Sequence, residues 1–218
     1  MVQKEQNREI NWDELGELSG ENTVKQIRYV VPVLKFNGST GKFGLLTADS
    51  EGNLIPEEIG EEVEGVILKI RRVFTAFVKT PGGTIRYFTN EHNSWKDSLV
   101  LFERRQDAPK PLAIDEGMIK ELRTKYPELR LRQNLYFLFK DQIVKLGVRG
   151  KSLSSLFDYY NAFGPREHLC QFVTKIQCHE ETNEGGLTYW VMDFLKDRTS
   201  EPEIVNTAVR EVAESLAL

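Results

Sequence analysis

The clearest pattern in the chain is an alternation of apolar and polar positions between residues 66 and 79. One parity is apolar apart from an interruption at Arg72, and it comprises Val66, Leu68, Ile70, Phe74, Ala76 and Val78. The other parity comprises Lys69, Arg71, Thr75, Phe77 and Lys79. A period of two is that of a β-strand whose two faces meet different surroundings. The sequence therefore predicts a strand with one face in the core and one cationic face that includes an aromatic ring.

Most of the other strand-like runs come in pairs joined by turn residues. The predicted hairpins are 66–79 with 84–90, 135–140 with 143–149 around Asp141-Gln142, and 171–180 with 187–195. Further strands are expected at 28–36, 43–47 and 98–103, and short helices at 115–126 and 153–163. Pro32 places the first of these strands at an edge or a bulge. About seven to nine strands in consecutive hairpins predict a mainly β (α+β) fold, in which a small antiparallel barrel carries inserted short helices and a C-terminal helix.

The chain of 218 residues is expected to form one domain with appended pieces. Residues 1–27 are polar and predict an N-terminal arm, 28–200 predict a single domain, and 201–218 predict an amphipathic helix. The apolar stripe of this helix comprises Ile204, Val205, Ala208, Val209, Val212 and Leu216. Two cysteines, no secretory signal and no long apolar run indicate a cytoplasmic protein without a membrane span.

The net charge of −4 hides a strong segregation of charge along the chain. Residues 65–151 carry 18 Lys and Arg against 9 Asp and Glu, whereas both flanking segments are acidic. A basic centre of this size indicates an anionic ligand, although charge runs can also be ordinary solvated surface.

Patterns of catalytic or cofactor-binding residues are largely missing. The segment Gly38–Lys42 has the wrong spacing for a phosphate loop, and neither a dinucleotide fingerprint nor a nucleophile elbow occurs. His168, Cys170, Cys178 and His179 have the chemistry of zinc ligands, but a single strand over 171–180 would hold the two cysteines about 26 Å apart. We therefore expect no catalytic residues, no metal and no cofactor.

The basic centre interleaves cations with aromatic rings. Proteins that bind single-stranded nucleic acid combine a cationic groove, which follows the phosphates, with rings on which the bases stack. The candidate binding residues are Lys69, Arg71, Phe77, Lys79, Arg86, Phe88, Trp95, Lys96, Lys145, Arg149 and Lys151. Whether Phe77 and Phe88 are contacts or core residues is left open by the pattern.

Five segments together resemble a known layout. They are Val63–Arg72, Tyr87–Glu91, Leu135–Phe139, Lys145–Leu153 and Tyr189–Phe194. Their arrangement resembles that of single-stranded-DNA-binding proteins encoded by phages and mobile elements, and this resemblance implies an OB-like barrel. The chain differs from bacterial housekeeping binders of this type because Ser215–Leu218 ends an expected helix, without a glycine-rich linker and an acidic tip.

The leading hypothesis is a non-catalytic protein that binds single-stranded DNA, with RNA as an open alternative, in replication or recombination. The other hypothesis is a protein–protein adaptor or structural protein of a phage or mobile element, whose terminal helix docks in a partner's groove. Self-association is left open.

Overall fold

The structure is a computed structural model that describes residues 31–48, 54–105, 108 and 110–217. The strands are β1 (Val33–Asn37), β2 (Lys42–Ala48), β3 (Leu54–Gly60), β4 (Glu62–Thr80), β5 (Gly83–Thr89), β6 (Ser98–Arg105), β7 (Leu112–Met118), β8 (Arg130–Phe139), β9 (Gln142–Arg149), β10 (Phe172–Thr182) and β11 (Thr188–Thr199). The helices are α3 (Ile119–Lys125), α4 (Ser152–Asn161), α5 (Pro202–Ala217) and the 3-10 helix η1 (Leu169–Gln171). The predicted N-terminal arm, residues 1–27, lies outside the described residues.

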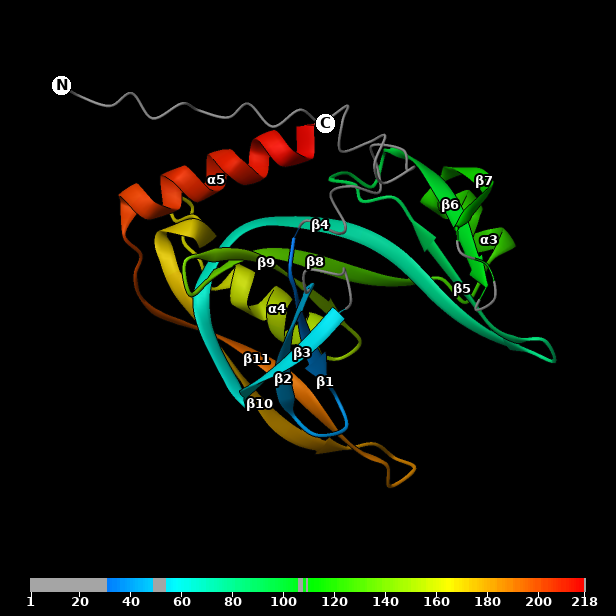
Figure 1. The fold of residues 1–218 in the computed structure, drawn as a ribbon, viewed down its shortest axis with the longest axis horizontal. Coiled ribbons are helices and arrows are strands. Elements are labelled where there is room, and N and C mark those ends of the chain that lie inside the picture. Colours follow the sequence, from blue (N-terminus) through cyan, green and yellow to red (C-terminus); the bar gives the residue numbers. More distant parts are fainter. Residues whose placement is uncertain (1–30, 49–53, 106–107, 109, 218) are drawn as a thin grey trace.

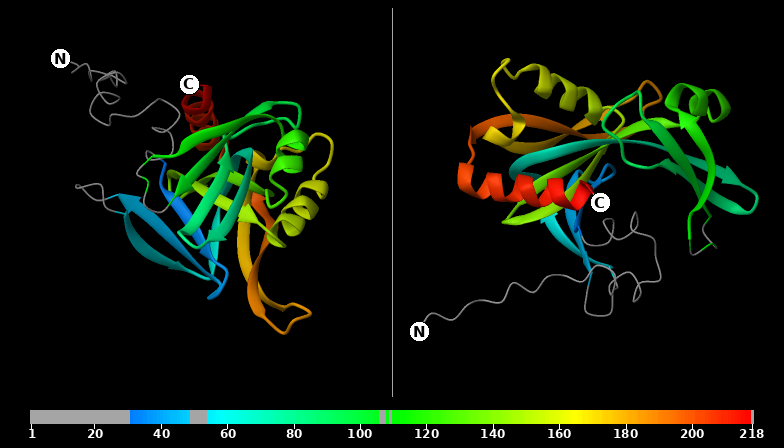
Figure 2. Two further views of the ribbon diagram at one scale, coloured as in Figure 1. Left: turned by 90° about the vertical axis from the view of Figure 1, so that its right-hand side faces the viewer. Right: turned by 90° about the horizontal axis from the view of Figure 1, so that it is seen from above.

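Strand β4 is the longest strand, and it forms a long arch beneath α5 in Figure 1. Its first residues pair with β10, its middle with β8 and its last residues with β5. The full order is β3-β2-β1-β9-β8-β4-β5-β6-β7, with β10 and β11 attached to β4 through β10. Figure 2 shows that β5, β6, β7 and α3 form a wing at one end of this sheet.

The mainly β, α+β class is confirmed, but the predicted antiparallel barrel is wrong. The sheet is mixed because β1 runs parallel to β9, with Val33 opposite Lys145. The sheet does not close: in the part of the chain that the structure describes, β11 pairs with β10 alone. The position beside β9 that a closing strand would need is occupied by β1.

Two predicted elements have different boundaries. The segment 115–118, expected in a helix, belongs to strand β7, and α3 begins only at Ile119. The β8–β9 hairpin turns at Lys140-Asp141, one residue before the predicted pair. Both turn residues have positive φ, 46° and 60°, which is the backbone that a two-residue type I′ turn requires.

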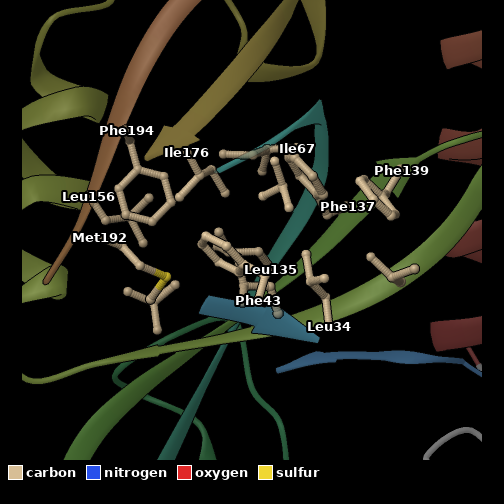
Figure 3. Packing of buried hydrophobic residues seen from close by; sticks show 14 of the residues in the cluster. Leu34, Phe43, Ile67, Leu135, Phe137, Phe139, Leu156, Ile176, Met192 and Phe194 are labelled. Carbon is tan, nitrogen blue, oxygen red and sulfur yellow. The ribbon is translucent and has the colours of Figure 1, made fainter. Parts of the chain in front are cut away.

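The main core lies between the concave side of the sheet and α4 (Figures 1 and 3). Alternate residues of β8, Leu135 and Phe137, are fully buried there with Leu146 of β9. Leu156 of α4 and Phe194 of β11 complete this layer. We call this side of the sheet the core face. A second, smaller cluster around Leu101 and Leu122 lies under the wing.

The predicted C-terminal helix is confirmed as α5, which lies along the other side of β4 (Figure 1). Val205, Ala208 and Val212 from its apolar stripe are buried. Within the described residues, no helix is both long enough and apolar enough to cross a membrane.

Candidate functional site

The strand register places most of the predicted binding residues on one side of the sheet. Residues directly opposite each other on neighbouring strands point to the same side. Lys69 lies opposite Tyr136, which lies opposite Lys145, and the same parity holds for Phe77 and Arg86 at the far end of β4. We call this side the basic face; its cationic and aromatic members are Lys69, Arg71, Phe77, Lys79, Arg86, Phe88, Arg130, Arg132, Tyr136, Lys145 and Arg149.

A β-bulge interrupts the alternation of sides along β4. The pairing with β8 shifts between Ile67 and Lys69. Ile67 belongs to the main core cluster, whereas Leu68 and the buried Val66 do not. The predicted alternation is therefore correct only from Lys69 onward. Lys69, Arg71 and Phe77 share a side because they have the same parity and no register shift separates them.

Helix α5 covers one end of the basic face, where β8 and β9 carry apolar residues. A cavity of about 610 Å³ is formed there by Leu138 and Ile143 together with Thr207 and Val212 of α5. The cationic part of the face begins beyond Tyr136, toward the wing.

Lys145 belongs to a largely buried ion pair within the chain. Its Nζ lies 2.5 Å from Glu91 Oε1, and the two side chains are 11% and 14% exposed. Asn134 Nδ2 and the Tyr136 hydroxyl also donate to the Glu91 carboxylate, each at 2.7 Å. Burial opposes ionisation of Glu91, but the charge of Lys145 and these hydrogen bonds outweigh it and lower the Glu91 pKa. The Lys145 ammonium is thus already paired within the chain, and its role as a ligand contact stays a prediction.

The two aromatic candidates have different environments. Phe88 is buried and stacks on Phe102, with ring centroids 5.5 Å apart, so it is not a surface platform. Phe77 is 56% exposed. The Arg86 guanidinium lies between them, 5.8 Å from the Phe77 centroid and 5.2 Å from that of Phe88. Arg86 thus supports Phe77, whose outer surface is open to a stacking partner.

Lys69 lies in partly buried, electropositive surroundings. Partial burial, and then the neighbouring charge of Arg71, lower the pKa of Lys69. No ion pair of Lys69, Lys79 or Arg149 occurs among the described residues. An anion placed here would relieve the repulsion between Lys69 and Arg71.

A cavity of about 500 Å³ lies where the basic face meets the β1–β2 turn and the β10–β11 hairpin. Its cationic and aromatic lining comprises Phe36, Phe77, Arg130, Arg149, Lys151, Tyr189 and Trp190. Trp190 is held by packing on Gly41, which has φ of 68° and where a Cβ would come within 2.5 Å of the indole. Lys151 is bound to Glu181 at 2.7 Å, which raises the Lys151 pKa. The cavity therefore joins rings and cations from segments far apart in sequence.

Trp95 and Lys96 do not belong to the basic face. The Trp95 ring lies 5.8 Å from the ring of Phe74 and 5.2 Å from the Arg72 guanidinium. Phe74 and Arg72 have the opposite parity on β4 from Lys69 and Phe77. Trp95 therefore lies on the other side of β4 from the basic face, and its role in binding stays a prediction.

Sequence reasoning missed several residues of this region. Arg130 and Arg132 point to the basic face, and the guanidinium of Arg132 lies against Gly147. A period of two is visible in the sequence from Arg130 through Tyr136, but the predicted strand began only at Leu135. Trp190 had no local signal because its place depends on Gly41, about 150 residues earlier.

The residues considered as zinc ligands are separated. The strand that divides the two cysteines is confirmed as β10. His179 contacts the carboxylates of Asp193 and Glu181, and burial raises the pKa of Cys178 to about 12. No group of three His, Cys, Asp or Glu side chains with metal-binding geometry is present among the described residues.

Comparisons of the chain with protein-family models, curated proteins and solved structures give no match.

Proposed function

We propose that the protein binds single-stranded nucleic acid, with DNA as the primary ligand, along the basic face and into the adjoining cavity. The observation that carries the proposal is the register, which places cations of β4, β5, β8 and β9 on one side together with the exposed Phe77. Cations along such a surface exchange condensed counterions for phosphates, and an exposed ring takes a base.

The strand connectivity supports this proposal. Strand β4 pairs with β8 on one edge and with β10 on the other, β9 follows β8 in a hairpin, α4 connects β9 to β10, and β11 follows β10. We infer that this unit is an open OB-like fold, with β5 to β7 and α3 inserted after its first strand. The second and third strands of an OB fold, here β8 and β9, provide the surface that binds oligonucleotides. These strands carry Arg130, Arg132 and Arg149.

The adaptor hypothesis has less support from the arrangement of α5. The adaptor hypothesis requires that the apolar stripe of α5 binds in a partner's groove. Val205, Ala208 and Val212 of this stripe are instead buried against the chain's own sheet. Ile204 is 43% exposed, which is a small apolar contact for a partner. We therefore favour nucleic-acid binding over the adaptor hypothesis. We propose that the protein binds without catalysis and acts in replication or recombination.

The proposal is tested by titrating a labelled single strand and a duplex of equal length at about 50 mM and about 200 mM salt. We expect tighter binding of the single strand and a steep loss of affinity with salt. Replacing Arg130 and Arg149 by Ala should reduce the log–log salt slope by about 1.4, because each single-strand phosphate contributes about 0.7. Between these two salt concentrations the affinity of both proteins falls. The factor by which it falls should be about seven times smaller for the variant than for the unmodified protein.

The matched control is Arg166→Ala, an exposed arginine in the loop after α4. Its removal should leave the salt slope unchanged. Absence of single-strand binding at low salt, or an equal slope in both arginine variants, would show that the basic face is ordinary solvated surface.

A further inference from the structure

A second surface with the chemistry of a stacking site lies on the opposite side of β4, at the wing. Trp95 is 48% exposed although one side of its ring is occupied by the Arg72 guanidinium. A cavity of about 390 Å³ lies beside the indole, lined by Ile119, Lys120, Arg123, Thr124 and Pro127. An exposed indole beside a groove with two cations is a place where a base can stack and a phosphate can bind.

The loop that carries Trp95 is held in place on both sides. The backbone of His92 pairs with that of Arg72 in both directions, at 2.9 and 3.0 Å. Asp97 Oδ2 accepts hydrogen bonds from the backbone N–H groups of Asn93 and Ser94, at 3.2 and 3.0 Å. The Arg72 guanidinium in turn donates to the Asn93 carbonyl. The indole is therefore presented in a fixed orientation, and a ligand that stacks on it does not have to order the loop.

The charge beside Trp95 is arranged by the periodicity of α3. Lys120 and Arg123 are three residues apart and share a side of the helix with Thr124, the side that lines the groove. The acidic Glu121 is directed to the start of the helix, where its Oε2 accepts from the backbone N–H of Met118 at 3.1 Å. Lys125 is paired with Asp115 at 2.9 Å. The groove side of α3 is thus cationic, and it complements an anionic chain.

The Trp95 groove and the cavity beside the basic face are lined by neighbouring residues of the chain. Pro127 lines the Trp95 groove, whereas the next residue, Glu128, and then Arg130 line the cavity of the basic face. The start of β8 therefore separates the two sites by a few residues only.

We propose that a single strand bound on the basic face continues around the start of β8 and stacks a further base on Trp95, with its phosphate at Lys120 and Arg123. This inference rests on the proposed function and adds to it a second contact site for the same strand. A short strand is held by the basic face alone, and a longer strand engages both surfaces.

The test compares labelled strands of about 6 and about 16 nucleotides, which span the usual site sizes of one such fold. Trp95→Ala should weaken binding of the long strand by about 5- to 150-fold, the range for loss of one stacked base, and leave the short strand unaffected. Trp95→Phe should restore most of the long-strand affinity because a phenyl ring still stacks.

The double variant Lys120→Ala/Arg123→Ala provides a second test. Both side chains are exposed, so their removal should disturb the fold less than removal of Trp95 does. It should weaken the long strand only and reduce its salt slope by about 1.4. Equal loss for both lengths, or no loss for the long strand, would overturn the second site while leaving the basic face in place. If the unmodified protein binds neither strand, the proposed function itself fails.

Discussion

Replacing Lys145 by methionine tests whether the ion pair inside the basic face is structural. The methionine keeps most of the apolar stem but removes the ammonium, which lies 2.5 Å from Glu91 Oε1. Both side chains are largely withdrawn from water, at 11% and 14% exposed. The carboxylate would keep its hydrogen bonds from the Tyr136 hydroxyl and the Asn134 amide.

The expected cost follows from the charge that is left behind. Removing one partner of a buried ion pair costs about 3–5 kcal/mol. Since two neutral donors still solvate the Glu91 carboxylate, we expect the lower end, about 3 kcal/mol of unfolding free energy. For a chain of this size that corresponds to a melting temperature lower by about 6–12 °C.

The assay is urea unfolding followed by circular dichroism, on Lys145→Met, Glu91→Gln and the double variant. The double variant should be more stable than the sum of the two single losses predicts, because it leaves no unpaired charge. A loss below about 1 kcal/mol for Lys145→Met, or strict additivity, would show a solvent-screened pair and refute this reasoning.

The pH dependence provides an independent measure of the same pair. The folded-state pKa of Glu91 lies below its ordinary value of 4.5, since its partners outweigh the effect of burial. The stabilisation is therefore fully present above about pH 4.5 and is lost as the pH falls through the lower folded-state value. Glu91→Gln should remove this part of the acid destabilisation.

Two further predictions concern the proposed binding surface. Phe77→Ala should weaken single-strand binding by about 1–3 kcal/mol with an unchanged salt slope, because stacking releases no counterions; a reduced slope in oligonucleotide titrations would contradict this. Since the pKa of Lys69 is lowered, the affinity for a single strand should fall with rising pH before the ordinary lysine value of 10.5 is reached, and Lys69→Arg should remove that loss. Titrations between about pH 7 and about pH 10 measure the effect, and identical profiles for the two proteins would exclude Lys69 as a phosphate contact.

The local part of the fold could be predicted from the sequence because alternation and turn residues are local signals. The hairpins at β4–β5, β8–β9 and β10–β11 were predicted on this basis, and so was the helix α5. The helix expected from residue 115 was misplaced because the acidic pair Asp115-Glu116 is typical of a helix start. In the structure, Asp115 instead lies on the edge strand β7, where its carboxylate pairs with Lys125 of α3.

The candidate site could be predicted in part, and the misses have a common cause. Parity along one strand placed Lys69 and Phe77 on the same side, but it could not show that Glu91 reaches Lys145 from 54 positions away, nor that Phe102 covers Phe88. Availability of a side chain depends on such distant partners. A strand pattern therefore predicts the side on which a residue lies better than it predicts whether the residue is exposed.

The failure of the sheet to close also depends on distant residues, because β1 and β11 are alternative partners for the same edge of β9. In a closed OB-like unit, the edge of β9 would pair with the last strand, β11. Here β1 takes that edge in parallel, through Val33 opposite Lys145 and Leu34 opposite Leu146. Leu34 is fully buried in the main core, so this pairing also adds apolar contacts beneath β9. A sequence pattern identifies both β1 and β11 as strands, but the choice between them depends on burial across more than 100 residues. Because β1 occupies the edge of β9, Phe36 and the β1–β2 turn lie beside Trp190. These residues form one wall of the cavity next to the basic face.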